Sequence, residues 1–212
     1  MSKNTLRVKP SVRILRPRKI DVISGPKVIC EVKVISPDGK VKSSSRTEKP
    51  LPDLILVQFK DWLSMLLAVR SNNASAFYTY QDVTNTTQTL YHRGNGNFGS
   101  SGYYLELDNA LGYVGGSLAI GADPTAAQRT DYELTSKTAE FEITAELTTD
   151  STIIKQGAWL ATGAGTVYET GYYLYLMNST GTSCQFLIFH DIPTPQAYIL
   201  NDSVQVTYTI QL

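Results

Sequence analysis

The sequence predicts a mainly β protein, an antiparallel β-sandwich of jelly-roll type with one amphipathic α-helix and an extended basic N-terminal arm. The C-terminal half contains several short stretches of alternating apolar and polar residues, separated by Gly, Pro and Asn turns. This pattern is typical of sandwiches and barrels. Only one stretch has helical periodicity, and Lys and Arg are concentrated near the N-terminus. For 212 residues we expect an arm over 1–26 and a single domain over 27–212.

The N-terminal arm is strongly basic. Its first 19 residues contain seven Lys and Arg and no acidic residue. Pro10 and Pro17 prevent a regular helix, so we expect an extended segment that becomes ordered on a partner. The residues expected to contact another subunit or nucleic acid are Lys3, Arg7, Lys9, Arg13, Arg16, Arg18 and Lys19.

Charge is segregated along a chain whose formal net charge is zero. Residues 1–49 hold 13 basic and 4 acidic residues, a balance of +9, and the remainder has a balance of −9. A basic segment of this kind can simply be solvated, or it can bind an acidic protein or, without sequence preference, DNA. The simplest acidic partner is the rest of another copy of the same chain.

Residues 27–46 are predicted to form a β-hairpin. Val28, Cys30, Val32 and Val34 recur at every second position, which is the period of a strand. The stretch "SPDGK" then supplies a turn, because Pro fixes one backbone dihedral and Gly39 accepts a positive one.

The segment of about 53–71 is the one predicted helix. Its apolar residues fall at spacings of three and four and form a broad face, made of Leu56, Phe59, Trp62, Leu63, Leu66 and Leu67. Pro52 and Asp53 suit the start of a helix. We expect this face to pack against a sheet, because a membrane-surface helix would carry more basic residues on its polar side.

Short strands are expected at 88–92 and at 117–121, on either side of a glycine-rich segment. The stretch "SLAIGADPTAAQRTDYEL", residues 117–134, begins as a strand and turns outward at Asp123 and Pro124. Arg129 and Asp131 are expected to anchor the return of this loop, through a salt bridge or backbone hydrogen bonds.

The remaining sequence predicts five further strands, at 138–148, 151–162, 171–178, 183–192 and 203–212. In the first of these, Phe141, Ile143, Ala145 and Leu147 alternate with polar residues, which predicts a half-buried strand. Its acidic residues, Glu140, Glu142 and Glu146, are expected to lie on the solvated face.

No pattern in the sequence predicts catalysis. The two histidines are His92 and His190; His190 could act as a base or a metal ligand, but a structural or surface role is expected. No nucleophile elbow or phosphate-binding loop occurs, and Asp123 with Asp131 lacks the density of a calcium loop. We therefore expect no catalytic residue, metal or cofactor.

Neither the cysteines nor the hydropathy of the chain indicates a particular function. Cys30 and Cys184 are the only cysteines, and the sequence leaves open whether they pair or stay free. No apolar run is long enough for a membrane span.

Two further surface features are predicted. Tyr103, Tyr104, Tyr172 and Tyr173 could form an aromatic surface patch for a sugar or a subunit, although many tyrosines are more simply sheet-face residues. Asn-x-Ser/Thr sequons, which are acceptors only where glycosylation occurs, begin at Asn73, Asn85, Asn178 and Asn201.

The order of several short motifs resembles small structural proteins of tailed bacterial viruses and of related, including spindle-shaped, archaeal viruses. A strand pair with a "DGK" turn is followed by the amphipathic stretch "VQFKDWLSMLLA". Then come "LAIGADPTAAQRTDYELTSK", "EFEITAELT", "IIKQGAWLAT", "FLIFHDIPTP" and the closing "DSVQVTYTIQL". The resemblance covers roughly residues 28–212.

The resemblance implies a non-enzymatic virion protein, a subunit of a ring-like tail, neck or adaptor assembly. Its partners would be other copies of itself and other virion proteins. A capsid subunit, or a receptor- or glycan-binding attachment module of the virion, is the alternative. An arm that adds a strand to a neighbouring sheet edge would fit such an assembly, and a closing head-to-tail contact would give a ring.

Overall fold

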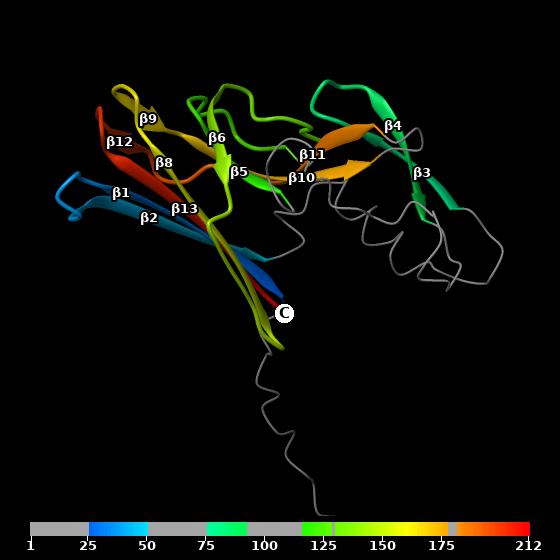
Figure 1. The fold of residues 1–212 in the computed structure, drawn as a ribbon, viewed down its shortest axis with the longest axis horizontal. Helices are drawn as coiled ribbons and strands as arrows, with labels where there is room; N and C mark the ends of the chain where they lie inside the picture. Colours follow the sequence, from blue (N-terminus) through cyan, green and yellow to red (C-terminus); the bar gives the residue numbers. More distant parts are fainter. Residues whose placement is uncertain (1–25, 51–75, 93–115, 129, 178–181) are drawn as a thin grey trace, which may run out of the picture.

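The computed structural model describes residues 26–50, 76–92, 116–128, 130–177 and 182–212. This part of the chain consists of β-strands joined by turns and loops (Figure 1). The strands are β1 (Lys27–Ile35), β2 (Val41–Pro50), β3 (Ala76–Gln81), β4 (Thr87–His92), β5 (Ser117–Gly121), β6 (Lys137–Glu142), β7 (Ala145–Thr148), β8 (Thr152–Leu160), β9 (Gly165–Val167), β10 (Glu169–Met177), β11 (Ser183–Asp191), β12 (Gln196–Tyr198) and β13 (Ser203–Gln211).

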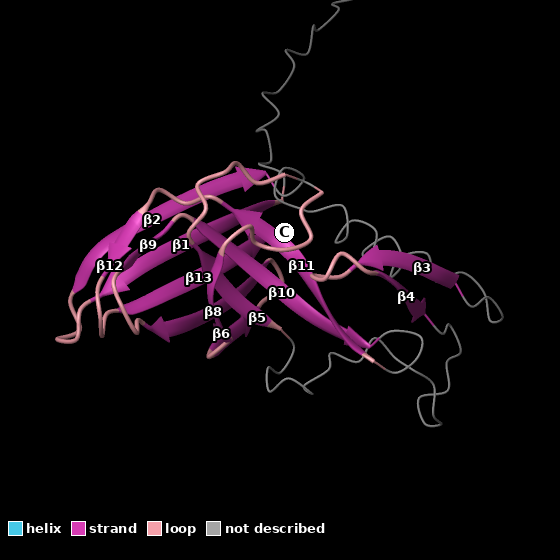
Figure 2. Cartoon of the chain, turned by 90° about the horizontal axis from the view of Figure 1, so that it is seen from above, coloured by secondary structure: helices cyan, strands magenta, loops and turns pink. Residues whose placement is uncertain are grey.

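Two larger sheets dominate the fold. The first has five strands in the order β2-β1-β13-β8-β7, and the second has four in the order β11-β10-β5-β6. Every strand pair in them is antiparallel. Two smaller pairs, β12–β9 and β3–β4, complete the described structure, and the β3–β4 hairpin lies to one side of the large sheets (Figure 2). The prediction of a mainly β, antiparallel fold is therefore confirmed.

The two larger sheets share one hydrophobic core. Alternate residues of β1 and β13 face alternate residues of β5, β10 and β11, because one face of each sheet is buried. Three aromatic rings connect the sheets: Phe189 stacks on Tyr172 at 5.9 Å and on Tyr208 at 5.6 Å between ring centroids. Such stacked pairs add to the stabilisation from burial alone.

The predicted hairpin is confirmed, and it extends further than expected. Strands β1 and β2 pair antiparallel, with Lys27 opposite Pro50. Gly39 has a φ of 82° in the connecting turn, as its position after Asp38 predicted. The Oγ atom of Ser36 donates a 2.9 Å hydrogen bond to the carbonyl of Lys40 across this turn.

The strand predicted over 138–148 is wrong in one respect: it is divided between the two sheets. Strand β6 pairs with β5 in the four-stranded sheet, and β7 pairs with β8 in the five-stranded sheet. The Thr144 amide donates a 2.8 Å hydrogen bond to the carbonyl of Gln156 at the crossing. The alternation consequently breaks, so that Phe141 is buried while Leu147 is 54% exposed.

Two predicted segments lie outside the described residues. They are the arm up to residue 25 and the helix predicted over 53–71. No helix in the described residues is long and apolar enough to cross a membrane.

Candidate functional site: a clamped loop and an acidic edge

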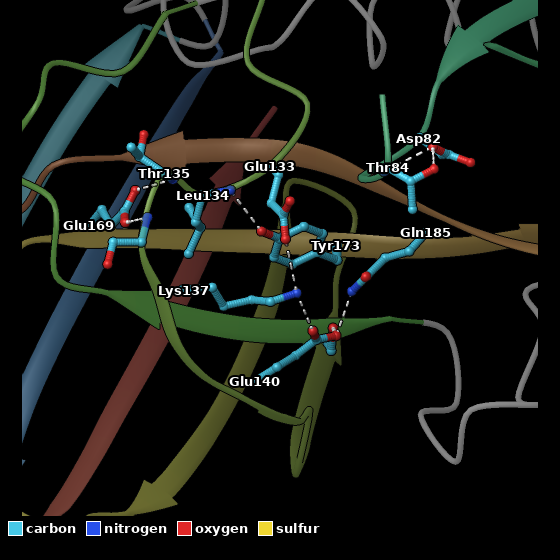
Figure 3. Close-up of polar contacts among 12 residues, drawn as sticks. Asp82, Thr84, Glu133, Leu134, Thr135, Lys137, Glu140, Glu169, Tyr173 and Gln185 are labelled. Carbon is cyan, nitrogen blue, oxygen red and sulfur yellow. Dashed lines mark hydrogen bonds and ion pairs between the residues drawn. The ribbon is translucent and has the colours of Figure 1, made fainter. Parts of the chain in front are cut away.

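The loop of residues 122–136 covers the outer face of the four-stranded sheet, the face turned away from the shared core. The side chain of Leu134 is buried there with Ala119, Tyr173 and Leu187. The Leu134 amide donates a 3.0 Å hydrogen bond to the hydroxyl of Tyr173, a contact visible in Figure 3. At its base the loop is closed by a 2.9 Å hydrogen bond from the Ala122 amide to the carbonyl of Ser136.

A buried histidine holds the middle of this loop. The Nδ1 atom of His190 lies 2.7 Å from Asp131, and its Nε2 atom lies 3.1 Å from Glu169. Because both ring nitrogens face carboxylate oxygens, only the doubly protonated ring can donate to both. Burial acts to lower the pKa of His190, but the hydrogen bonds and charges of Glu169 and Asp131 outweigh it and raise that pKa.

Glu169, the first residue of β10, binds the end of this loop. Its carboxylate accepts hydrogen bonds from the amides of Ser136, at 2.7 Å, and Thr135, at 3.1 Å; Figure 3 labels Glu169 and Thr135. Burial opposes ionisation, but the hydrogen bonds from His190 and these amides outweigh it and lower the pKa of Glu169. A Cβ atom on Gly121 would lie 2.2 Å from this carboxylate, so the end of β5 must be glycine for the carboxylate to fit.

A second polar network surrounds Glu140 on the outer face of β6. The carboxylate accepts 2.5 Å hydrogen bonds from Ser117 and Gln185 and a further one from the hydroxyl of Tyr175. Lys137 lies 3.1 Å from its other oxygen. Burial acts to raise the pKa of Glu140, but the hydroxyl hydrogen bonds and the Lys137 charge outweigh it and lower that pKa. Glu140 was expected to be merely solvated; it holds β5, β6, β10 and β11 together.

Two buried aspartates tie the edge strand β2 to the rest of the domain. Asp191 accepts hydrogen bonds from Thr47 and from Lys49, the latter at 2.5 Å. Asp202 lies 2.7 Å from the Nζ atom of Lys42 and accepts a 2.9 Å hydrogen bond from the Ile199 amide. These lysines are thus partnered within the chain, and part of its N-terminal charge is neutralised internally.

The segment 137–148, which we call the acidic edge, forms the border of both sheets. Within the described residues β6 and β7 each pair on one side only. All four side chains of β7 are exposed. Glu142 is exposed as well, and Glu146 forms an ion pair with Lys155 at 2.5 Å. Between β6 and β7 this edge lies against β8, where the Thr144 amide donates its hydrogen bond to the Gln156 carbonyl.

The predicted aromatic patch is wrong for two of its residues. Tyr172 is 6% exposed and Tyr173 is fully buried; one packs into the shared core and the other beneath Leu134. The cause is that β10 is an inner strand, covered on both faces. Tyr103 and Tyr104 lie outside the described residues.

The structure describes some of the other predicted site residues. Asp131 accepts a 2.7 Å hydrogen bond from the Gln128 amide besides its contact with His190, whereas Arg129 lies outside the described residues, as do all seven basic arm residues. Cys30 and Cys184 are both buried and free. Among the sequons, Asn85 and Asn201 occupy turn positions with positive φ.

Sequence reasoning missed the buried carboxylates Glu169, Asp191 and Asp202. The available signal was a charged residue at the beginning or end of an otherwise apolar strand, where burial demands a partner. No group of three His, Cys, Asp or Glu side chains in the described residues could hold a metal ion.

Comparison with protein families, with curated proteins and with solved structures finds no match for this chain.

Proposed function

We propose that this protein is a non-enzymatic structural subunit of a virion, which assembles with copies of itself into a ring-like tail, neck or adaptor structure. The observation that carries the proposal is the separation of charge. The first 19 residues hold seven basic residues and no acidic one, while an acidic strand edge borders both sheets of the described residues. A positive segment and a negative edge in one chain favour contact between copies.

The buried polar groups favour a role in holding shape. The side chains of His190 and Glu169 are each 1% exposed, and they contact one another and the loop above them. Asp191 and Asp202 bind lysines and backbone amides. A general acid or base must reach its substrate directly or through water, and these groups are occupied instead in fixing loops and an edge strand.

The fold class fits the same role. Two antiparallel sheets around one core are consistent with a β-sandwich of jelly-roll type, a fold that occurs in viral capsid proteins. The ordered series of motifs resembling tail and adaptor proteins adds to the argument, and two of its stretches, "SLAIG" and "SVQVTYTIQ", are strands β5 and β13.

A ring would follow from the direction of the contact. An arm on one copy that binds the body of the next makes a head-to-tail interface, and such interfaces close into rings when the rotation permits. Other virion proteins would then bind the exposed surfaces of the ring.

Deletion of residues 1–20 tests this function. We expect the truncated chain to keep the β-type circular dichroism spectrum of the full chain and to sediment as a monomer. An unchanged oligomer after the deletion would show that the arm is not the assembly element. Immunogold labelling of virus particles would then locate the protein in the virion, and labelling confined to host material would contradict a virion role.

A further inference from the structure

Strand β7 is an edge strand that exposes an apolar side chain. It ends the five-stranded sheet, and no strand of the described residues pairs with its other side. Leu147 is 54% exposed. It lies opposite Ile154 of β8, which lies opposite Thr209 of β13, on the sheet face turned away from the core residue Tyr208. An edge of this kind is a template for pairing with another chain.

The other three sheet borders of the described residues carry features that hinder such pairing. Strand β2 carries two lysines, an arginine and a final proline, and β6 carries a lysine and two glutamates. On β11 the Gln185 carbonyl accepts a 3.1 Å hydrogen bond from the Val83 amide. Lysine, proline and other charged residues are the usual protection of edge strands. Strand β7 has neither lysine nor proline, and its one charge, Glu146, is paired with Lys155 at 2.5 Å.

The turn between β7 and β8 fixes which backbone groups of β7 point away from the sheet. The Thr149 amide donates a 2.8 Å hydrogen bond to the carbonyl of Thr152. Hydrogen-bonded and non-hydrogen-bonded residue pairs alternate along an antiparallel ladder, so Leu147, two residues earlier, also has its backbone groups turned toward β8. The backbone groups of Glu146 and Thr148 consequently point toward the open side of the strand.

We propose that β7 pairs with β7 of a second copy of this chain, antiparallel and across a two-fold axis centred on Leu147. Glu146 of each copy would face Thr148 of the other, and each of these two pairs would exchange both main-chain hydrogen bonds. Leu147 would face Leu147 of the other copy in a non-hydrogen-bonded pair, the type in which facing side chains come closest. The two five-stranded sheets would then continue into one another.

Charge selects this register over its neighbours. The two-fold centre must fall on a residue, because facing residues of paired strands lie on the same side of the sheet. A centre on Glu146 would set this glutamate against its own copy, and a centre on Thr148 would set Glu146 against Asp150. Like charges on facing residues are destabilising. With the centre on Leu147, Glu146 faces the neutral Thr148 instead.

The contact is small, because β7 has only four residues. Stable interfaces bury roughly 1,200–2,000 Å², which is more than one short strand provides, so the pairing needs copies that another contact already holds together. In the proposed function that contact is the arm, and the inference rests on it. A two-fold contact uses the same surface on both copies. It would therefore join a copy in one ring to a copy in a second ring.

Single cysteines in the full-length chain test the register. Leu147→Cys places the thiols of two copies on facing positions, whereas Glu146→Cys does not. Leu160→Cys is the surface control, because Leu160 is 62% exposed at the other end of β8; the two native cysteines are buried. We expect oxidised Leu147→Cys to form disulfide-linked dimers on a non-reducing gel about tenfold faster than either control, because pairing raises the effective thiol concentration. Equal rates for the three variants, or a fastest rate for Glu146→Cys, would overturn the proposed pairing.

A proline tests the backbone contact. The Thr148 amide points away from β8, so Thr148→Pro removes a pairing donor and leaves the hydrogen bonds between β7 and β8 in place. We expect this variant to keep the urea unfolding midpoint of the unchanged chain and to sediment with half its oligomer mass, as one ring instead of two. Thr148→Ala keeps the amide and, as the matched control, should sediment like the unchanged chain.

The outcomes separate this inference from the proposed function. If the arm deletion gives a monomer but Thr148→Pro leaves the oligomer mass unchanged, assembly through the arm stands and the pairing of β7 is wrong. A halved mass without the Leu147→Cys cross-link would show that β7 pairs with a different strand, which also overturns the inference. If Leu147→Cys cross-links as expected in a chain that sediments as a monomer, the pairing stands and the ring is wrong.

Discussion

The Nε2 atom of His190 lies 3.1 Å from the Oε2 atom of Glu169, with both side chains 1% exposed. The opposite ring nitrogen lies 2.7 Å from Asp131. The ring of His190 thus joins strand β10 to the loop of residues 122–136. The loop stretch "ADPTAAQRTDYEL" is therefore clamped to the sheet at the side chain of Asp131 as well as at its base.

The clamp predicts that stability falls as the pH rises above neutral. The pKa of His190 is raised in the folded protein, so its contribution is complete below the unfolded value of about 6.5. That contribution is lost as the pH rises through the folded pKa. The pKa of Glu169 is lowered, so its contribution is complete above about 4.3 and is lost at lower pH. Urea unfolding between pH 4 and pH 9 should show greatest stability between these two limits.

Replacement of His190 separates this effect from general titration. The difference in unfolding free energy between the unchanged chain and His190→Gln should be largest near pH 5–6 and should shrink toward pH 9. A His190→Gln protein with the same profile as the unchanged chain would show that the imidazolium does not hold the loop.

Replacement of Glu169 by alanine should lower the free energy of unfolding substantially. Glu169→Ala leaves the buried His190 ring and two loop amides without their acceptor, and loss of one partner of a buried ion pair typically costs about 3–5 kcal/mol. Glu142→Ala, on an exposed position of the acidic edge, should change the unfolding free energy by less than about 0.5 kcal/mol. Equal effects of the two substitutions in denaturant titrations would contradict the burial assigned to Glu169.

The crossing between the sheets depends on Gly157 of β8. A Cβ atom there would lie 2.2 Å from the Glu142 carbonyl oxygen, which is a backbone atom that cannot rotate away. Gly157→Ala should lower the unfolding free energy by about 1–3 kcal/mol. Gly163→Ala, with no atom within 4 Å of the added carbon, is the control. Tolerance of alanine at both glycines in thermal unfolding would argue against the close crossing of β6 and β8.

Both cysteines should be unreactive in the folded protein. Burial is the largest cause that raises the pKa of Cys30, to about 12, and that of Cys184, to about 11, so little thiolate is present at pH 8. A thiol reagent should label neither residue quickly in native buffer and both in guanidinium chloride without reductant. Failure to label either one after denaturation would indicate the disulfide that the structure lacks.

Sequence periodicity predicted the strands in which one face is buried throughout. In β1 and β13 every second residue enters the core, so the alternation of apolar residues in the sequence matches the alternation of buried side chains. The alternation of 138–148 is just as regular, yet the chain changes sheets at Ile143 and Thr144. That change depends on the Gln156 carbonyl and on Gly157 in a strand further along the chain, which local periodicity cannot detect.

The polar contacts of the site were harder to predict, because each joins residues far apart in the sequence. Glu169 is the first residue of the otherwise largely apolar strand β10, and its partners Thr135 and Ser136 lie in a loop with no regular spacing. The tyrosines of β10 look alike in the sequence, and only the order of strands in the sheet shows that Tyr172 and Tyr173 are covered on opposite faces.

The molar mass of the full-length protein in solution, measured by sedimentation equilibrium at low salt, tests the central claim most directly. We predict an integral multiple of the 23.4 kDa chain mass that decreases as salt screens the arm from the acidic edge. A mass of one chain at every concentration and every salt condition would contradict a self-assembling structural subunit.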